Sequence, residues 1–386
     1  MTIVTMTSVS GFFATDIFLP AIPAMQIFYG KSKIEMQLLI SIFLYALATS
    51  QLIYGPISDA IGRRWPLLFA LGAYVSASFT IPQTNDFNLL LGLRAVQGIG
   101  ACGAIVIGRA VIGDLYSGVE LQRFFLSMSI IVGLSPAFAP VFGQGLYTLF
   151  DWKACFYFTG FFGVLIFAAV YFMLCETREV KPFEWHFLFD AISKYRVALH
   201  SSGFKWGVAI ISISQSAYFA YLSESAFLLQ SQHFPLRFLG YSYVSLSIAY
   251  VIGNVCARHL ASKVSSTINF TCGFTAFAFA CVFISLGLFI APYNYVVMII
   301  GMSILTFANG FLLPLGTAAA IGAVPAYPGS ASGLAGFCQL FCSAIAAQLV
   351  GIVTEHRPVN FGFFILLLGI ANCGLYFFKV RLQLAR

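Results

Sequence analysis

The sequence Ala-Thr-Asp-Ile-Phe-Leu-Pro-Ala-Ile-Pro occupies residues 14–23, within the first apolar run of the chain. This run covers residues 3–28, and Asp16 is its only charged residue. Because about 20 apolar residues suffice for a helix to cross a bilayer, the run predicts a first membrane span. A charge at the centre of a span costs about 2.5–3.5 kcal/mol, so Asp16 is a candidate functional residue. Pro20 cannot donate to the carbonyl of Asp16, which predicts a loosened backbone at that depth.

The composition of the whole chain is that of a membrane protein. Apolar residues make up 60% of the sequence and charged residues 9%, whereas soluble domains carry about 25% charged residues. Since irregular backbone cannot face lipid, the long apolar runs predict an all-α membrane protein. The sequence predicts twelve such spans, at residues 3–28, 36–57, 66–83, 87–112, 124–149, 153–175, 204–230, 239–261, 268–290, 294–321, 329–353 and 359–379.

The distribution of basic residues predicts that both termini lie in the cytoplasm. With that orientation, 14 of the 20 Lys and Arg residues fall on the cytoplasmic side and five outside, as the positive-inside rule requires. The net charge of +7 is therefore a topology signal, and no nucleic-acid partner is needed to explain it. The polar segment 176–203 predicts a cytoplasmic linker with an amphipathic surface helix. It separates two six-helix bundles, at residues 1–175 and 204–386.

The two predicted bundles resemble each other weakly. The fourth span (residues 97–101) and the tenth (residues 309–314) are both interrupted by glycine at corresponding places. Parallel repeats with broken helices in matching positions indicate a central binding site between two bundles, as in secondary transporters. Gln97 and Asn309 are candidate residues of that cavity.

A glycine- and arginine-rich loop follows the second span, at residues 55–64. A tight cytoplasmic turn explains its spacing, since glycine permits positive φ, an aspartate pairs with arginine or caps a helix, and arginines bind headgroups. The pattern resembles the GxxxDxxGRR loop signature of the major facilitator superfamily. The resemblance implies gating roles for Gly55, Asp59, Gly62, Arg63 and Arg64.

Two further motifs resemble proton-coupled drug exporters of that superfamily. Residues 94–100 resemble the RxxQGxG motif of the fourth span, where Arg94 either has a carboxylate partner or a wet cavity, or extends to the outer interface. Residues 133–143 resemble the antiporter motif, in which Pro136, Pro140 and Gly143 predict a kinked, closely packed helix. Gln144 stands where a second glycine is usual, and either adds a polar group to the cavity or alters helix packing.

The opening stretch resembles the first-span signature of the bicyclomycin-resistance (Bcr/CflA) drug exporters. The resemblance covers essentially the whole chain and includes residues 109–115 with Asp114, although Gly113 replaces a usual arginine. Glu224 in the seventh span is a departure, with Tyr221 on the same helical face. It is either a second acid for a cationic substrate or proton, or a carboxylate at the headgroups or bonded to a hydroxyl.

The resemblance implies a proton-coupled antiporter for multidrug efflux in the bacterial inner membrane. In this hypothesis Asp16 takes up a proton, Arg94 or the substrate is released, and access alternates between the two sides. We expect a monomer that contacts lipid, protons and a small amphipathic substrate, with no cofactor and no enzymatic activity. One alternative is a specific metabolite or siderophore exporter or a nutrient importer of the same fold. Another is a receptor or scaffold without transport.

Overall fold

The computed structural model describes residues 2–116, 118–177, 186–231, 237–261, 263–291, 294–355, 357 and 359–384. Every element in these ranges is a helix, as the apolar runs predict, and the all-α fold class is confirmed. The chain divides into two compact units, Met1–Tyr195 and Arg196–Arg386. The dividing point falls inside the segment predicted as the linker.

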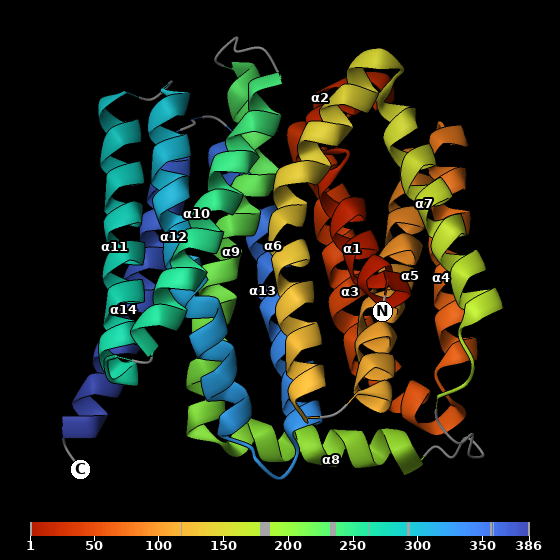
Figure 1. Cartoon of the computed structure of the whole chain (residues 1–386). Helices are drawn as coiled ribbons and strands as arrows, with labels where there is room; N and C mark the ends of the chain where they lie inside the picture. The colour runs from red at the N-terminus through yellow and green to blue at the C-terminus, as the bar shows by residue number, and fades with distance from the viewer. Residues whose placement is uncertain are drawn as a thin grey trace. The chain divides into compact units, whose positions relative to one another are not determined.

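The first unit contains seven α-helices that precede the linker helix (Figure 1). The first predicted span is formed by α1 (Thr2–Asp16), a 3₁₀ turn (Leu19–Ala21) and α2 (Ile22–Tyr29). The next five spans are α3 (Lys33–Ile61), α4 (Arg64–Thr80, continued by the 3₁₀ turn Ile81–Gln83), α5 (Phe87–Leu115), α6 (Gly118–Leu149) and α7 (Trp152–Met173).

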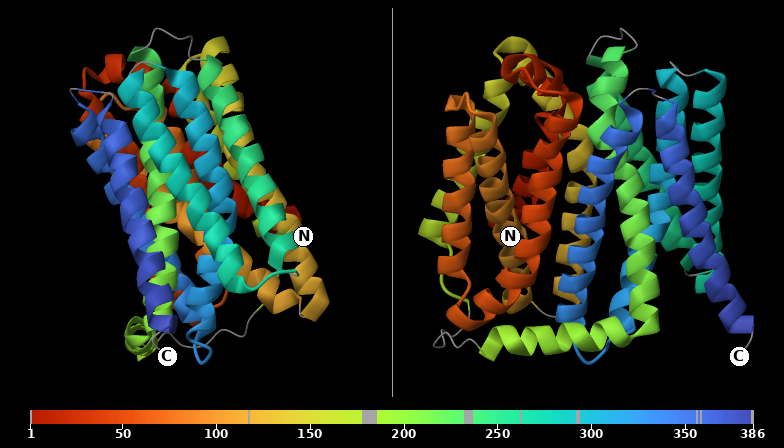
Figure 2. Two further views of the ribbon diagram at one scale, coloured as in Figure 1. Left: turned by 90° about the vertical axis from the view of Figure 1, so that its left-hand side faces the viewer. Right: turned by 180° about the vertical axis from the view of Figure 1, so that it is seen from behind.

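The linker and the second unit follow. The helix α8 (His186–His200) lies where the amphipathic linker helix is predicted and runs crosswise to the long helices of the first unit (Figure 2). The residues 178–185 of the predicted linker lie outside the described part. The six long helices of the second unit are α9 (Ser202–Ser231), α10 (Arg237–Ala261), α11 (Ser266–Ile290), α12 (Tyr295–Gly322), α13 (Pro328–Thr354) and α14 (Asn360–Leu384).

Helices therefore occur at all twelve predicted spans. Ten of them are long and apolar enough to cross a membrane by themselves, among the described residues. The helices α6 and α9 are outside this group, and α9 carries several serines together with Gln215 and Glu224. The orientation of the termini stays a prediction.

Glycines bring equivalent helices of each unit into close contact. A Cβ added at Gly98 of α5 would lie 2.6 Å from the carbonyl oxygen of Phe43 in α3. A Cβ at Gly310 of α12 would likewise lie 2.6 Å from the carbonyl oxygen of Tyr250 in α10. Small residues allow such backbone contact in lipid, where hydrophobicity supplies little force between helices. The weak likeness of the fourth and tenth spans thus corresponds to the same packing in both units.

Candidate functional site

The first span breaks at Asp16. Ile17 N–H donates to the carbonyl of Phe13 at 3.0 Å, after which α1 ends and a 3₁₀ turn with Pro20 begins. The break is the loosened backbone that the sequence predicts, because Pro20 has no N–H for the Asp16 carbonyl. The Asp16 side chain is 3% exposed, and its carboxyl has no hydrogen bond or ion pair within the described ranges.

The break packs directly against α6. A Cβ added at Gly143 would lie 1.7 Å from the carbonyl oxygen of Ile17, a distance that no real side chain allows. The backbone of Gly143 also accepts a contact from the Cys155 thiol of α7 at 3.6 Å. The antiporter motif therefore places its glycine against the residue next to Asp16. The helix α6 continues through Pro136 and Pro140 without interruption.

Arg94 lies inside the first unit and is 0% exposed, so it does not extend to the outer interface. Its Nη1 donates to the carbonyl of Ala14 at 3.1 Å, and its Nε donates to the carbonyl of Leu39 at 3.2 Å. The guanidinium also lies 4.4 Å from the ring centre of Phe18 and 4.5 Å from that of Phe43. Arg94 thus caps the C-terminal end of α1, where a positive charge is favourable. Backbone carbonyls take the place of the expected carboxylate partner.

Gln97 is buried and orients Arg94, and its place in a substrate cavity stays a prediction. Its Oε1 accepts from Arg94 Nη1 at 2.6 Å, and its Nε2 donates to Ser78 Oγ at 2.7 Å. The side chain is 0% exposed. Ser78 in turn donates to the carbonyl of Tyr74, so the network joins α4 and α5 to the end of α1.

Gln144 keeps one free polar atom. Its Nε2 donates to Thr148 Oγ1 at 3.0 Å, one turn further along α6. Its Oε1 is buried and has no partner among the described residues. Gln144 replaces a usual glycine, and the sequence left open whether it adds a polar group or alters helix packing. The unpaired oxygen favours a polar group that a neighbour or ligand can bind.

In the second unit, Asn309 holds the middle of α9. Its Nδ2 donates to the carbonyl of Ser214 at 3.1 Å, and Asn372 Nδ2 of α14 approaches Ser214 Oγ at the same distance. Both asparagine side chains are at most 2% exposed, and neither Oδ1 has a partner in the part of the chain that is described. Ser214 and Asn372 escaped the sequence analysis, although polar residues at mid-span were the available signal.

Tyr221 belongs to a buried cluster of hydroxyl groups. Its hydroxyl lies 3.2 Å from that of Tyr295 and 3.4 Å from Ser242 Oγ, which joins α9 to α10 and α12. Glu224 lies one turn further along α9 and is 1% exposed. This burial contradicts a carboxylate that reaches the outer headgroups.

The loop signature forms an ionic cluster where α3 ends and α4 begins, beside the end of α5. Arg63 is 4% exposed, and its guanidinium lies 2.7 Å from an oxygen of Asp59 and 2.9 Å from an oxygen of Asp114. Burial opposes the charge of Arg63, but the hydrogen bonds and charges of these two carboxylates outweigh it and raise the pKa of Arg63. Gly62 has φ of 90°, the positive value that the tight turn predicts.

Glu176 completes this cluster and was missed by the sequence analysis. Its carboxylate accepts from the backbone N–H of Arg63 at 2.7 Å and of Arg64 at 3.1 Å, at the start of α4. An anion at a helix N-terminus is stabilised by the helix dipole. A Cβ at Gly62 would lie 2.7 Å from Glu176 Oε2, so glycine also makes room for this cap. Arg64 donates to the carbonyl of Tyr171, which secures α7 at the same place.

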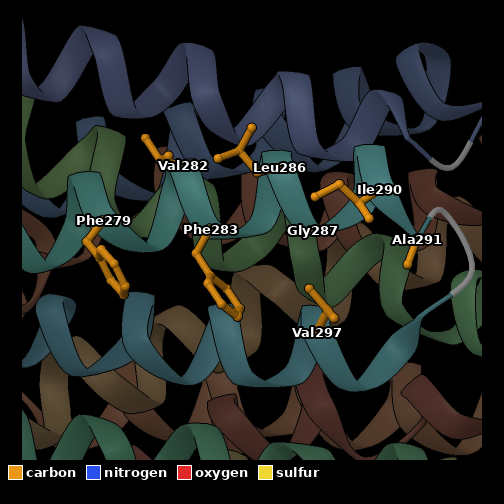
Figure 3. Close-up of a pocket in the computed structure, with 8 residues that line it drawn as sticks. All are labelled: Phe279, Val282, Phe283, Leu286, Gly287, Ile290, Ala291 and Val297. Carbon is orange, nitrogen blue, oxygen red and sulfur yellow. The ribbon is translucent and has the colours of Figure 1, made fainter.

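A separate pocket lies between α11 and α12 in the second unit. Its volume is about 440 Å³, and Figure 3 shows Phe279 and Phe283 of α11 pointing toward the helix α12, which contributes Val297. All lining residues are apolar or glycine, and none is a predicted site residue. This pocket offers apolar contact only and provides no group for proton or substrate chemistry.

The chain is a multi-pass helical membrane protein whose interior holds a few costly polar groups, a combination that is common in membrane transporters. The family model of the Major Facilitator Superfamily matches residues 4–347. The chain therefore belongs to the major facilitator superfamily, as the loop signature predicts.

Named relatives agree with this assignment. Multidrug resistance protein D of Escherichia coli (strain K12) is 26% identical over 93% of this chain and 90% of its own length. The bicyclomycin resistance protein homolog of Haemophilus influenzae is 30% identical over 43% of this chain and 42% of its own length. The crystal structure of the D-xylose-proton symporter has a TM-score of 0.74 at 12% identity, and the match covers 96% of each chain. This last likeness concerns the fold alone.

Proposed function

We propose that this transporter exports small amphipathic compounds in exchange for protons, as a multidrug antiporter of the bacterial inner membrane. The carboxyl of Asp16, buried and without a described partner, is the observation that carries the proposal. An ionised carboxylate there loses its water and faces the negative end of the α1 dipole. A bound proton removes both costs, so the site can exchange a proton as its access to water changes.

The neighbours of Asp16 support a coupling of proton binding to helix movement. Arg94 holds the carbonyl two residues before Asp16, and Gly143 of α6 contacts the residue after it. A change of charge at Asp16 therefore acts on a backbone segment that α5 and α6 both contact. In the proposed cycle, protonation from outside and displacement of the proton by substrate favour opposite access states.

The substrate class rests on the relatives and on buried polar groups, one in α6 of the first unit and three in the second unit. The printed names of the two relatives concern multidrug and bicyclomycin resistance, which favours export of amphipathic compounds. Glu224 and Tyr221 would supply a carboxylate and a hydroxyl for a cationic or hydrogen-bonding substrate. Asn309 and Gln144 each present an unpaired buried oxygen that accepts hydrogen bonds.

Two other functions remain as alternatives. A specific metabolite or siderophore exporter, or a nutrient importer, would use the same proton site with one preferred substrate. A screen of drugs against metabolites on reconstituted protein separates this alternative from multidrug export. A receptor or scaffold would show no flux of any compound under a pH gradient.

The test of proton coupling is Asp16→Asn in proteoliposomes with an imposed pH gradient and ethidium as the transported probe. We expect the variant to lose gradient-driven ethidium movement, because an amide cannot exchange a proton. Glu355→Gln is the matched control, since Glu355 is exposed and lies at the end of α13, and it should transport as the wild type does. Undiminished proton-coupled transport by Asp16→Asn would refute proton exchange at Asp16.

A further inference from the structure

A proline leaves one backbone carbonyl of α3 without its normal donor. Pro56 lies inside α3, four residues after Leu52. In an α-helix, the carbonyl of residue 52 accepts from the N–H of residue 56, and proline has no N–H. The carbonyl of Leu52, which is partly buried, is therefore open to a donor from outside the helix.

The linker helix supplies that donor. The hydroxyl of Tyr195 in α8 donates to the carbonyl oxygen of Leu52 at 3.2 Å. Burial raises the pKa of Tyr195 above its ordinary value near 10, so the hydroxyl keeps its proton at neutral pH. The donor and the freed acceptor thus match in chemistry, and both lie in the first unit.

We propose that the carbonyl freed by Pro56 is the docking site of the linker helix, and that Tyr195 fastens α8 to α3. Leu52 lies three residues before Gly55, where the loop signature begins within the last turns of α3. Tyr195 is also the last residue of the first unit. This hydrogen bond from Tyr195 to the Leu52 carbonyl, here called the Tyr195 clasp, therefore fixes the point at which the chain leaves that unit.

A second anchor follows soon after in the chain. Ser201 Oγ donates to the carbonyl of Ala323, the residue that caps the C-terminal end of α12 in the second unit. The residues 196–200 between the two anchors are helical, and a helix cannot lengthen without breaking its own hydrogen bonds. If the two units move against each other, one anchor must open. Ser201 Oγ also accepts from the backbone N–H of Phe204 at 3.4 Å, whereas the Tyr195 side chain makes one hydrogen bond, so the Tyr195 clasp is the anchor that opens; this step rests on the proposed alternating access.

Hydrogen–deuterium exchange of the full chain in lipid nanodiscs tests the clasp. The variant Tyr195→Phe keeps the ring and removes only the donor. We expect amide exchange in residues 186–200 to rise about three- to tenfold, the range for one neutral hydrogen bond. Tyr157→Phe removes an exposed hydroxyl in α7 and should leave this segment unchanged.

A second variant, at Pro56, tests whether the freed carbonyl is the reason that Tyr195 docks there. Pro56→Ala restores a backbone N–H that pairs with the Leu52 carbonyl, and Pro56→Ser does the same if the alanine variant does not purify. In that background Tyr195→Phe should change exchange by less than about twofold, because the carbonyl no longer needs an outside donor. An equal effect of Tyr195→Phe in both backgrounds, or no effect in either, would overturn the proposal.

The release step has its own readout. In proteoliposomes, Tyr195→Phe should change the maximum rate of ethidium movement at least twofold and leave the half-saturating concentration unchanged. An unchanged maximum rate would overturn release of the clasp during transport. The exchange experiment needs no substrate, so the docking site is tested even if Asp16 proves not to couple protons.

Discussion

The contact between Gly143 and the broken first span predicts the effect of a single methyl group. In Gly143→Ala the new Cβ would lie 1.7 Å from the carbonyl oxygen of Ile17 and 2.7 Å from its carbonyl carbon. Both atoms belong to the backbone, so no change of rotamer relieves the overlap. The helix α6 or the end of α1 must move by about 1 Å or more, and overpacking of this kind costs about 1–3 kcal/mol.

Helix propensity acts in the opposite direction. Alanine is favoured over glycine in a helix interior by about 1 kcal/mol, which offsets part of the overlap. Because the overlap is with backbone atoms, its cost falls in the upper part of that range, about 2–3 kcal/mol, and we expect a net loss of about 1–2 kcal/mol in unfolding free energy for Gly143→Ala. Gly145→Ala, in the same helix, is the matched control, because nothing lies within 4 Å of its added Cβ.

Thermal unfolding of the purified full chain in one detergent measures the difference. The control should unfold at the wild-type temperature or slightly above it, and Gly143→Ala should unfold below it. If the two variants unfold at the same temperature, α6 does not press on the break in the way the structure shows. A change of charge at Asp16 would then have no backbone contact through which to act on α6.

Two further substitutions test the other contacts. Glu176→Gln should lower the unfolding free energy by about 1 kcal/mol, because the anion at the start of α4 is lost. The difference in unfolding free energy between wild type and variant should become smaller in high salt. A difference that does not depend on salt would contradict the charge argument. Arg94→Lys keeps the charge, but one ammonium cannot hold Leu39 and Ala14 as the guanidinium does. We expect a clearly lower unfolding temperature and lost transport, whereas full activity with lysine would show that charge alone matters.

The sequence predicted the features that depend on local rules. Asp16 is recognisable as a charge in an apolar run, and Pro20 predicts the break beside it from backbone chemistry alone. Gly62 at positive φ and the Arg63–Asp59 pair follow from spacing within one turn. The helix positions follow from the lengths of the apolar runs, and the structure confirms them.

The partners of these residues could not be predicted in the same way. Arg94 was expected to have a carboxylate partner or a wet cavity, or to extend to the outer interface, but it binds carbonyls of Ala14 and Leu39, and every residue has such a carbonyl. Glu176 stands at the head of a polar segment in which many charges look alike. For Leu52, the sequence shows that Pro56 frees the carbonyl, but only the tertiary structure shows that Tyr195 fills it.

These contacts share one physical pattern. Inside the units, polar side chains such as Arg94, Asn309 and Tyr195 donate to backbone carbonyls. The ion pairs of Lys31 with Glu35 and of Arg63 with Asp59 and Asp114 lie instead near helix ends. A donor bound to a carbonyl holds two helices together without requiring a second charge in the membrane. The ionised carboxyl of Asp16 has only acceptor oxygens and does not join this pattern, so in the proposed cycle a bound proton neutralises a charge that no described donor balances.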